Sequence, residues 1–229
     1  MTTVAAIFEK QSKDMFRNIG VLAMFVVFPI VALALENLIQ NPYMEGGVFV
    51  GQMAAMFIAM GLVMSVGTII AEDRENNSLR FLIIAGVKPM SYILGIGGFL
   101  FLASAVTSAA FGFIGGLGLA GLARLMPVML SGAIASILLG AIIGMIAKNQ
   151  QAATGMAMPI GMALGMGPIA ATFNETVDRV FSIFYTQQVG VFVSDPTMSL
   201  TRPLATIWIN IAVLAIVFGV VYNKKGRAS

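Results

Sequence analysis

Six long apolar stretches constrain this chain more than any other feature of its sequence. They lie at about 19–39, 47–71, 92–118, 125–147, 153–173 and 204–222. Each stretch is long enough to cross the roughly 30 Å of bilayer hydrocarbon as an α-helix. With 59% hydrophobic and only 10% charged residues, the chain also has more apolar surface than one soluble core can bury. The sequence therefore predicts an all-α membrane protein, with six transmembrane helices in a single domain over 1–229.

The distribution of Lys and Arg predicts the orientation in the membrane. With both termini inside, the outer segments hold three basic residues, which are Arg124, Arg179 and Arg202. The inner segments hold ten, which are Lys10, Lys13, Arg17, Arg74, Arg80, Lys88, Lys148, Lys224, Lys225 and Arg227. This excess is the positive-inside pattern, so we expect a multi-pass protein of the cell membrane with cytoplasmic termini. Anionic lipid then accounts for the net charge of +3, and no nucleic-acid partner is expected.

The segment before the first span, residues 1–18, is polar but patterned. Its apolar residues Val4, Ile7, Phe8 and Met15 fall near one helical face, and its charged residues lie elsewhere. This arrangement predicts an amphipathic elbow helix lying on the membrane surface. A frayed polar tail is the alternative interpretation.

Several residue types that chemistry would need are missing from the sequence. It contains no G-x-x-x-x-G-K-[ST] phosphate loop, no His, no Cys and no charged residue in the middle of a span. Ion-coupled transporters usually need ionisable groups at membrane depth, and intramembrane hydrolases need a nucleophile paired with a base. We therefore expect no catalytic residue, metal site or cofactor in this chain, so that any energy must come from a partner.

The inner loop, residues 72–91, carries the strongest functional signal. A charged cluster leaves the second span, polar residues that can cap a helix follow, and an apolar stripe comes next. Gly86 and Pro89 then end the pattern, so we expect a short amphipathic helix on the cytoplasmic face. The candidates for contact with a soluble partner are Glu72, Asp73, Arg74, Glu75, Asn77, Ser78, Leu79, Leu82 and Ile83.

This loop resembles the segment between the second and third helices of the type-two ABC exporter permeases. That family carries an acidic-basic cluster, a Gly-Thr-Leu-Glu-x-Leu-Leu core, a Pro, and Leu-Gly-Lys at the entry to the third helix. Glu75 matches the family acid, Ser78 stands for the Thr, and Leu79 stands for the Leu. Leu82-Ile83 match the Leu pair, and Leu94-Gly95 match the entry to the third helix.

Three positions depart from the family pattern. Asn77 replaces the Gly, Arg80 replaces the acid of the core, and Ile96 replaces the Lys. The change at Asn77 is tolerable because Asn adopts the left-handed backbone conformation more readily than most residues. These departures bear on individual contacts more than on the family resemblance.

The resemblance implies a function and a set of partners. The chain would be the permease subunit of an ATP-driven exporter that moves a small molecule, peptide or lipid out of the cell by alternating access. A separate cytoplasmic ABC ATPase would bind ATP and Mg²⁺ and dock beneath the inner loop. A second permease copy would complete a homodimer surrounded by membrane lipid. A polytopic protein unrelated to ABC transporters, such as a channel or an assembly factor, is the alternative.

The outer segment, residues 174–203, contains a second amphipathic pattern. Over 175–187 the residues Val177, Val180, Phe181 and Phe184 recur at helical spacing, which predicts one helix. Asp195-Pro196 marks a turn after it. By the family resemblance this segment would be an extracellular gate, and the alternative is a passive lid.

Two glycine pairs predict where spans pack closely. Gly140-x-x-x-Gly144 and Gly161-x-x-x-Gly165 let helix backbones approach, while Pro159 and Pro168 interrupt the fifth span. Adaptable Met side chains and a few polar ones make up a possible substrate path, with simple packing or lipid contact as the alternative. Its candidates are Gln52, Met156, Met158, Met162, Met166 and Asn210.

The expected orientation can be tested directly because the chain has no native cysteine. In intact cells, a membrane-impermeant thiol reagent should label Thr197→Cys and should label Ser78→Cys only after permeabilisation. The reason is the ten-to-three bias of basic residues toward the inner segments. Labelling of Ser78→Cys but not Thr197→Cys in intact cells would reverse the topology.

Overall fold

The computed structural model describes residues 7–9, 12–13, 18–39, 47–78 and 89–226, and these residues are almost entirely helical. The α-helices are α2 (Ile19–Leu38), α3 (Val48–Met56), α4 (Val63–Glu75), α6 (Pro89–Ile114), α7 (Leu119–Ile146), α8 (Gln150–Ala171), α9 (Glu175–Phe181), α10 (Tyr185–Ser194) and α11 (Thr201–Val221). Two π-helical segments are η1 (Phe57–Leu62) and η2 (Tyr222–Gly226). Among the described residues, six helices are long and apolar enough to cross a membrane, which confirms the predicted six-span all-α fold.

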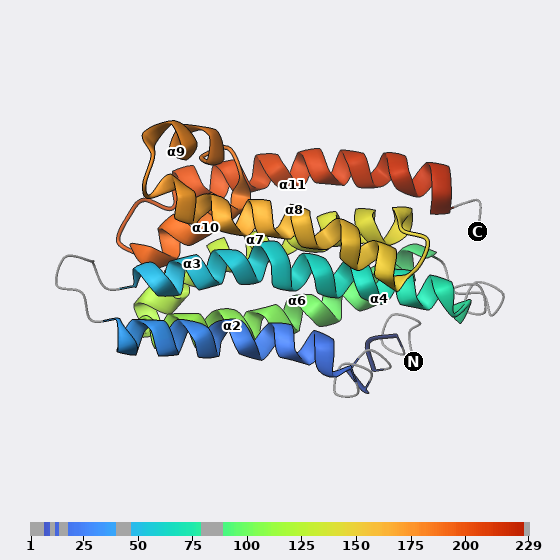
Figure 1. Cartoon of the computed structure of the whole chain (residues 1–229), viewed down its shortest axis with the longest axis horizontal. Helices are drawn as coiled ribbons and strands as arrows, with labels where there is room; N and C mark the ends of the chain where they lie inside the picture. The colour runs from blue at the N-terminus through green and yellow to red at the C-terminus, as the bar shows by residue number, and fades with distance from the viewer. Residues whose placement is uncertain (1–6, 10–11, 14–17, 40–46, 79–88, 227–229) are drawn as a thin grey trace.

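The six spans run side by side along the long axis of the molecule (Figure 1). The start of α2, the end of α4 and the end of α11 lie at one end, which we call the terminal end. Helices α9 and α10 lie at the opposite end, which we call the cap end. Each successive span crosses back, so neighbouring spans in the sequence are antiparallel.

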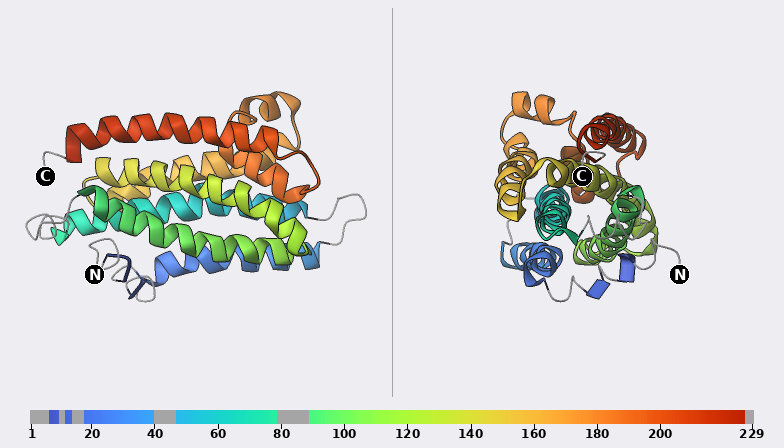
Figure 2. Two further views of the ribbon diagram at one scale, coloured as in Figure 1. Left: turned by 180° about the vertical axis from the view of Figure 1, so that it is seen from behind. Right: turned by 90° about the vertical axis from the view of Figure 1, so that its right-hand side faces the viewer.

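The span from Val48 to Glu75, which joins α3, η1 and α4, is the most buried of the six. Within its most apolar window 78% of the residues are buried, and 67% are buried for α7, against 17% for α11 and 22% for α2. The end-on view shows α3, α4 and α7 surrounded by the other spans (Figure 2). The exposed apolar faces of α2 and α11 are therefore surfaces for lipid or for another membrane protein.

Glycines explain how the two central spans approach so closely. A Cβ atom built on Gly140 would lie 2.8 Å from the carbonyl oxygen of Val63, and one on Gly144 would lie 2.8 Å from that of Gly67. Gly161 lets α8 approach η1 equally closely, because a Cβ built on it would lie 2.9 Å from the Cα of Met60. Both glycine pairs are thus confirmed as close-packing faces.

Local signals set the ends of the spans, and several lie a few residues from where we expected them. The third span begins at Pro89 rather than 92, because proline suits the first turn of a helix. It ends at Ile114 rather than 118, since Gly116 takes a left-handed conformation with φ of 70°. The fourth span begins at Leu119 rather than 125. The second span continues to Glu75, so the charges after residue 71 are helical.

The described part of the N-terminal segment packs against the bundle. Residues 7–9 and 12–13 are helical, and Ile7 is buried. The Phe8 ring meets the Phe99 ring of α6 edge-on, with centroids 5.3 Å apart. The other residues of the expected elbow helix, Val4 and Met15 among them, lie outside the described residues.

The close approach of α4 and α7 predicts a specific sensitivity to a single methyl group. Gly140→Ala should destabilise the purified protein by about 1–3 kcal/mol, the usual cost of overpacking a tight interface. Gly98→Ala is the matched control, because a Cβ there meets nothing within 4 Å. The control should be neutral or slightly stabilising through helix propensity. Equal thermal unfolding temperatures for the two variants would contradict this account of the interface.

Candidate functional site

Arg74, near the end of α4, binds the end of another span. Its Nη1 atom donates hydrogen bonds to the carbonyl oxygens of Gly144, Met145 and Ala147, at 3.3, 2.5 and 3.2 Å. These carbonyls belong to the C-terminal end of α7, where backbone acceptors lack helical partners and the helix dipole is negative. We expected Arg74 to be exposed for a partner protein. It is instead half-buried, because its guanidinium satisfies these backbone groups.

The next residue, Glu75, binds the start of the following span. Its Oε2 atom accepts a hydrogen bond of 3.0 Å from the backbone N–H of Gln150, the first residue of α8. The Asn149 side chain caps the same helix by accepting from the N–H of Ala152 at 2.8 Å. A carboxylate is favourable here because the N-terminal end of a helix is positive. Arg74 and Glu75 thus hold both sides of the turn between α7 and α8, and we call these contacts the helix-end clamp.

A third contact ties the start of α6 to the same region. The Tyr92 hydroxyl donates a 2.5 Å hydrogen bond to Oδ2 of Asp73. Asp73 is at the end of α4, and Tyr92 is in the first turn of α6. Both sides of the inner loop are therefore attached to the bundle at the terminal end.

The cap end differs from the single helix expected over 175–187. Two helices, α9 and α10, are separated at Ser182–Phe184, where the backbone of Phe184 is extended. Val180 is 54% exposed on α9. Phe181 does pack, because its ring covers Gly167 of α8. The expected turn at Asp195 is confirmed, since α10 ends at Ser194.

Helix α10 is the buried element of the cap, and the sequence analysis missed it. Its first residue, Tyr185, is buried, and its hydroxyl lies 3.0 Å from the Oγ atom of Ser136 in α7. Ser136 Oγ also lies 2.6 Å from the carbonyl oxygen of Ile58 in η1, to which it donates. The Ser136 hydroxyl has one proton, which it donates to Ile58. In the bond between the two hydroxyl groups, Tyr185 is therefore the donor and Ser136 the acceptor. This buried chain of bonds joins the cap to the π-helical part of the central span.

A hydroxyl group of α10 replaces the backbone donor that Pro168 removes from α8. Pro168 has no N–H, which leaves the carbonyl of Leu164 without its helical donor. Thr186 of α10 donates to that carbonyl at 2.8 Å. A polar run, Tyr185-Thr186-Gln187-Gln188, was the signal in the sequence that could have located α10, because buried polar residues require partners.

A small cavity of about 260 Å³, lined by both apolar and polar residues, lies between α3, α8, α9 and α10, near the turn after α10. Gln52, Asp178, Gln187 and Asp195 are among its lining residues. Gln187 Nε2 donates to Asp178 Oδ1 at 2.9 Å, which links α10 to α9. The hydroxyl and N–H of Thr197 donate to Asp195 and lower the pKa of its carboxyl group, so Asp195 is ionised at neutral pH.

Comparison with known families decides what kind of protein this is. Residues 14–223 match the family described as ABC-2 family transporter protein. The chain belongs to the ABC-2 transporter family. A membrane protein of this family is the permease subunit of an ABC transporter, embedded in the membrane by its multiple spans. No curated protein matches the chain.

The backbone conformation explains one departure from the ABC-2 loop pattern. Asn77, which stands where the family has Gly, has a φ of 57°. It therefore adopts the left-handed conformation that Asn tolerates better than most residues, as we expected. The apolar stripe of the expected coupling helix, Leu79, Leu82 and Ile83, lies outside the described residues.

The residues of the predicted substrate path take different positions in the structure. Gln52 lines the 260 Å³ cavity at the cap end. Asn210 of α11 instead donates to the carbonyl oxygens of Ile183 and Thr206, at 2.8 and 2.9 Å. Met158, Met162 and Met166 are 45%, 41% and 47% exposed on α8, and Met156 packs partly buried against the α4–α7 contact.

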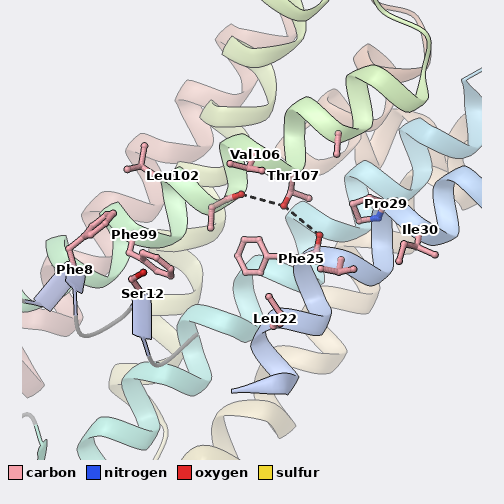
Figure 3. A pocket seen from close by; sticks show the side chains of 13 residues that line it. Phe8, Ser12, Leu22, Phe25, Pro29, Ile30, Phe99, Leu102, Val106 and Thr107 are labelled. Carbon is pink, nitrogen blue, oxygen red and sulfur yellow. Dashed lines mark hydrogen bonds between the residues drawn. The ribbon is translucent and has the colours of Figure 1, made fainter. Parts of the chain in front are cut away.

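A larger cavity of about 600 Å³ lies between α2 and α6 (Figure 3). Residues within 22–30 and 99–110 form its two long walls, and Phe8 and Ser12 lie at one end. The Thr107 hydroxyl lies 3.5 Å from the carbonyl oxygen of Phe25, which Pro29 leaves without a helical donor, and 3.3 Å from that of Ala103.

The bonds at Ser136 predict an order of mutational effects. Ser136→Ala leaves the Ile58 carbonyl and the Tyr185 hydroxyl unpaired, which should cost about 1–3 kcal/mol. Tyr185→Phe keeps the Ser136–Ile58 bond and should cost about 0.5–1.5 kcal/mol. The buried Ser108 bonds only within its own helix, so Ser108→Ala is the matched control. Unfolding of the purified variants would measure the order, and a larger effect for Tyr185→Phe would overturn it.

Proposed function

We propose that this ABC-2 permease exports a small molecule, peptide or lipid, driven by a separate cytoplasmic ATPase. The terminal end faces the cytoplasm of the cell, and the ATPase docks beneath the loop 72–91. ATP binding closes a pair of ATPase subunits and moves the loops of two permease copies. The ligand on the partner thereby shifts the permease between inward-facing and outward-facing states.

The helix-end clamp is the observation that carries this proposal. Arg74 and Glu75 end the span that leads into the docking loop, and both bind the turn between α7 and α8. A displacement of the loop therefore acts on three spans at once, because α4 cannot move without the ends of α7 and α8. The Asp73–Tyr92 bond extends the same connection to α6.

The cap end is proposed as the outer gate. Helix α10 contacts α7 through Tyr185 and α8 through Thr186, so movement of either span acts on the cap. Opening the gate requires the buried hydrogen bonds of α10 to break or move with their partners. Phe181 covers Gly167 of α8, and its ring centroid lies 5.6 Å from that of Phe184.

A homodimer is proposed because part of the predicted substrate path is exposed on one face of α8. Met158, Met162 and Met166 are exposed on α8, where a second copy can face them. Flexible Met side chains suit a surface that adapts to varied apolar cargo. A channel or assembly factor unrelated to ABC transporters, the alternative from the sequence, gains no support from the family match.

Docking of the ATPase is the most direct test. Leu82→Ala should weaken copurification of a P-loop ATPase with the permease by about 1–3 kcal/mol, the range for an apolar interface anchor. Leu119→Ala is the matched control, because Leu119 is 86% exposed at the start of α7, at the cap end. The docking proposal fails if Leu82→Asp, a stronger change, leaves the ATPase bound.

A second variant in that experiment separates docking from transmission. Glu75→Gln weakens the clamp to α8 but leaves the apolar stripe of the loop unchanged. The ATPase should therefore still copurify, while cargo-stimulated ATP hydrolysis falls. Full stimulation with Glu75→Gln would show that the clamp does not transmit the movement.

A further inference from the structure

We propose that the cavity between α2 and α6 binds one acyl chain of a membrane phospholipid. We call this cavity the α2–α6 groove. Its rim faces away from the bundle, since Val106, Ile30 and Leu102 are 74%, 58% and 54% exposed. Both walls are membrane spans, so the groove opens sideways into the hydrocarbon of the bilayer.

The chemistry of the groove suits a ligand that makes no hydrogen bonds. Its lining is almost wholly apolar, and the exceptions are Ser12 at one end and Thr107. The Thr107 hydroxyl is within hydrogen-bonding distance of the carbonyls of Phe25 and Ala103, at 3.5 and 3.3 Å. It thereby covers the backbone oxygen that Pro29 would otherwise leave open in the wall. A hydrocarbon chain can fill such a site without loss of any hydrogen bond.

The shape of the groove selects a chain over a bulkier occupant. The walls extend over 22–30 of α2 and 99–110 of α6, which correspond to lengths of about 12 and about 17 Å at helical rise. The volume of about 600 Å³ is too small for another helix, since a helix with side chains is about 10 Å across. If an apolar cavity of this size were empty, its lining atoms would have no packing partners on the side that faces the cavity.

The end of the groove nearest the terminal end provides a place for the lipid headgroup. Phe8 and Phe99 meet there, with Ser12 beside them (Figure 3). Lys13 of the same N-terminal segment is exposed, and its ammonium group pairs with Glu9 at 2.8 Å. Basic residues at a membrane surface favour anionic phospholipid. The chain would therefore enter from the leaflet next to the terminal end.

Retention of a brominated lipid tests the proposal on the full chain. The only tryptophan, Trp208, is replaced by Phe, and a single reporter is placed at Leu102→Trp on the rim of the groove. Leu94→Trp is the matched control, because Leu94 of α6 is 59% exposed and Leu102 is 54% exposed. Each protein is reconstituted into phosphatidylcholine–phosphatidylglycerol vesicles brominated in the acyl chains, and is then exchanged into detergent.

In vesicles both reporters should be quenched by bromine. After exchange, the loss of fluorescence should persist for Leu102→Trp and disappear for Leu94→Trp, because only the groove retains a chain. Ala103→Phe, which fills the groove, should abolish the retained quenching, and Ala110→Phe serves if that variant does not insert. Full recovery at both positions would mean bulk lipid only. An unquenched Leu102→Trp in vesicles would mean that protein or cargo covers the groove. Either result overturns the proposal.

Discussion

A membrane provides no water for backbone groups, so every irregular turn of a span needs a hydrogen-bond donor or acceptor from the protein itself. In this permease hydroxyl groups on neighbouring helices meet that need. Ser136 donates to Ile58 within the π-helical segment, and Thr186 donates to Leu164 next to a proline. Each such bond requires two elements to meet at one level. The irregular turns therefore determine how α7, α8 and α10 pack around the central span.

Helix ends present the same constraint at the membrane surface. The last carbonyls of α7 and the first N–H groups of α8 have no helical partners, and Arg74 and Glu75 bind them in turn. These charges lie at the end of the span Val48–Glu75, and an ionised side chain costs less near the end of a span than at its centre. Because both residues belong to the end of α4, the groups that complete two spans also join them to the proposed docking loop. In the proposed mechanism, the stability of the bundle and the transmission of the ATPase movement thus depend on the same contacts.

Much of the fold could be predicted because it follows from local patterns. Apolar length predicted the spans, and the pairs that include Gly140 and Gly161 predicted close packing, since small residues at that spacing form a groove along a helix. The cap was predicted less well. The apolar spacing over 175–187 continues across the break at Phe184, so periodicity alone could not reveal two helices. The contacts of Arg74 with α7 could not be predicted because its acceptors lie about seventy residues away.

The sequence by itself determined that this is a membrane protein, how many spans it has and to which family it belongs. Apolar length and short motifs are properties of neighbouring residues, so they can be read without the tertiary structure. Only the tertiary structure decided which polar side chains serve the bundle and which remain for partners. That choice depends on distant backbone groups, such as the α7 carbonyls bound by Arg74 and the Leu164 carbonyl bound by Thr186. Their need for a donor arises only when the helices have ended or bent and have packed together.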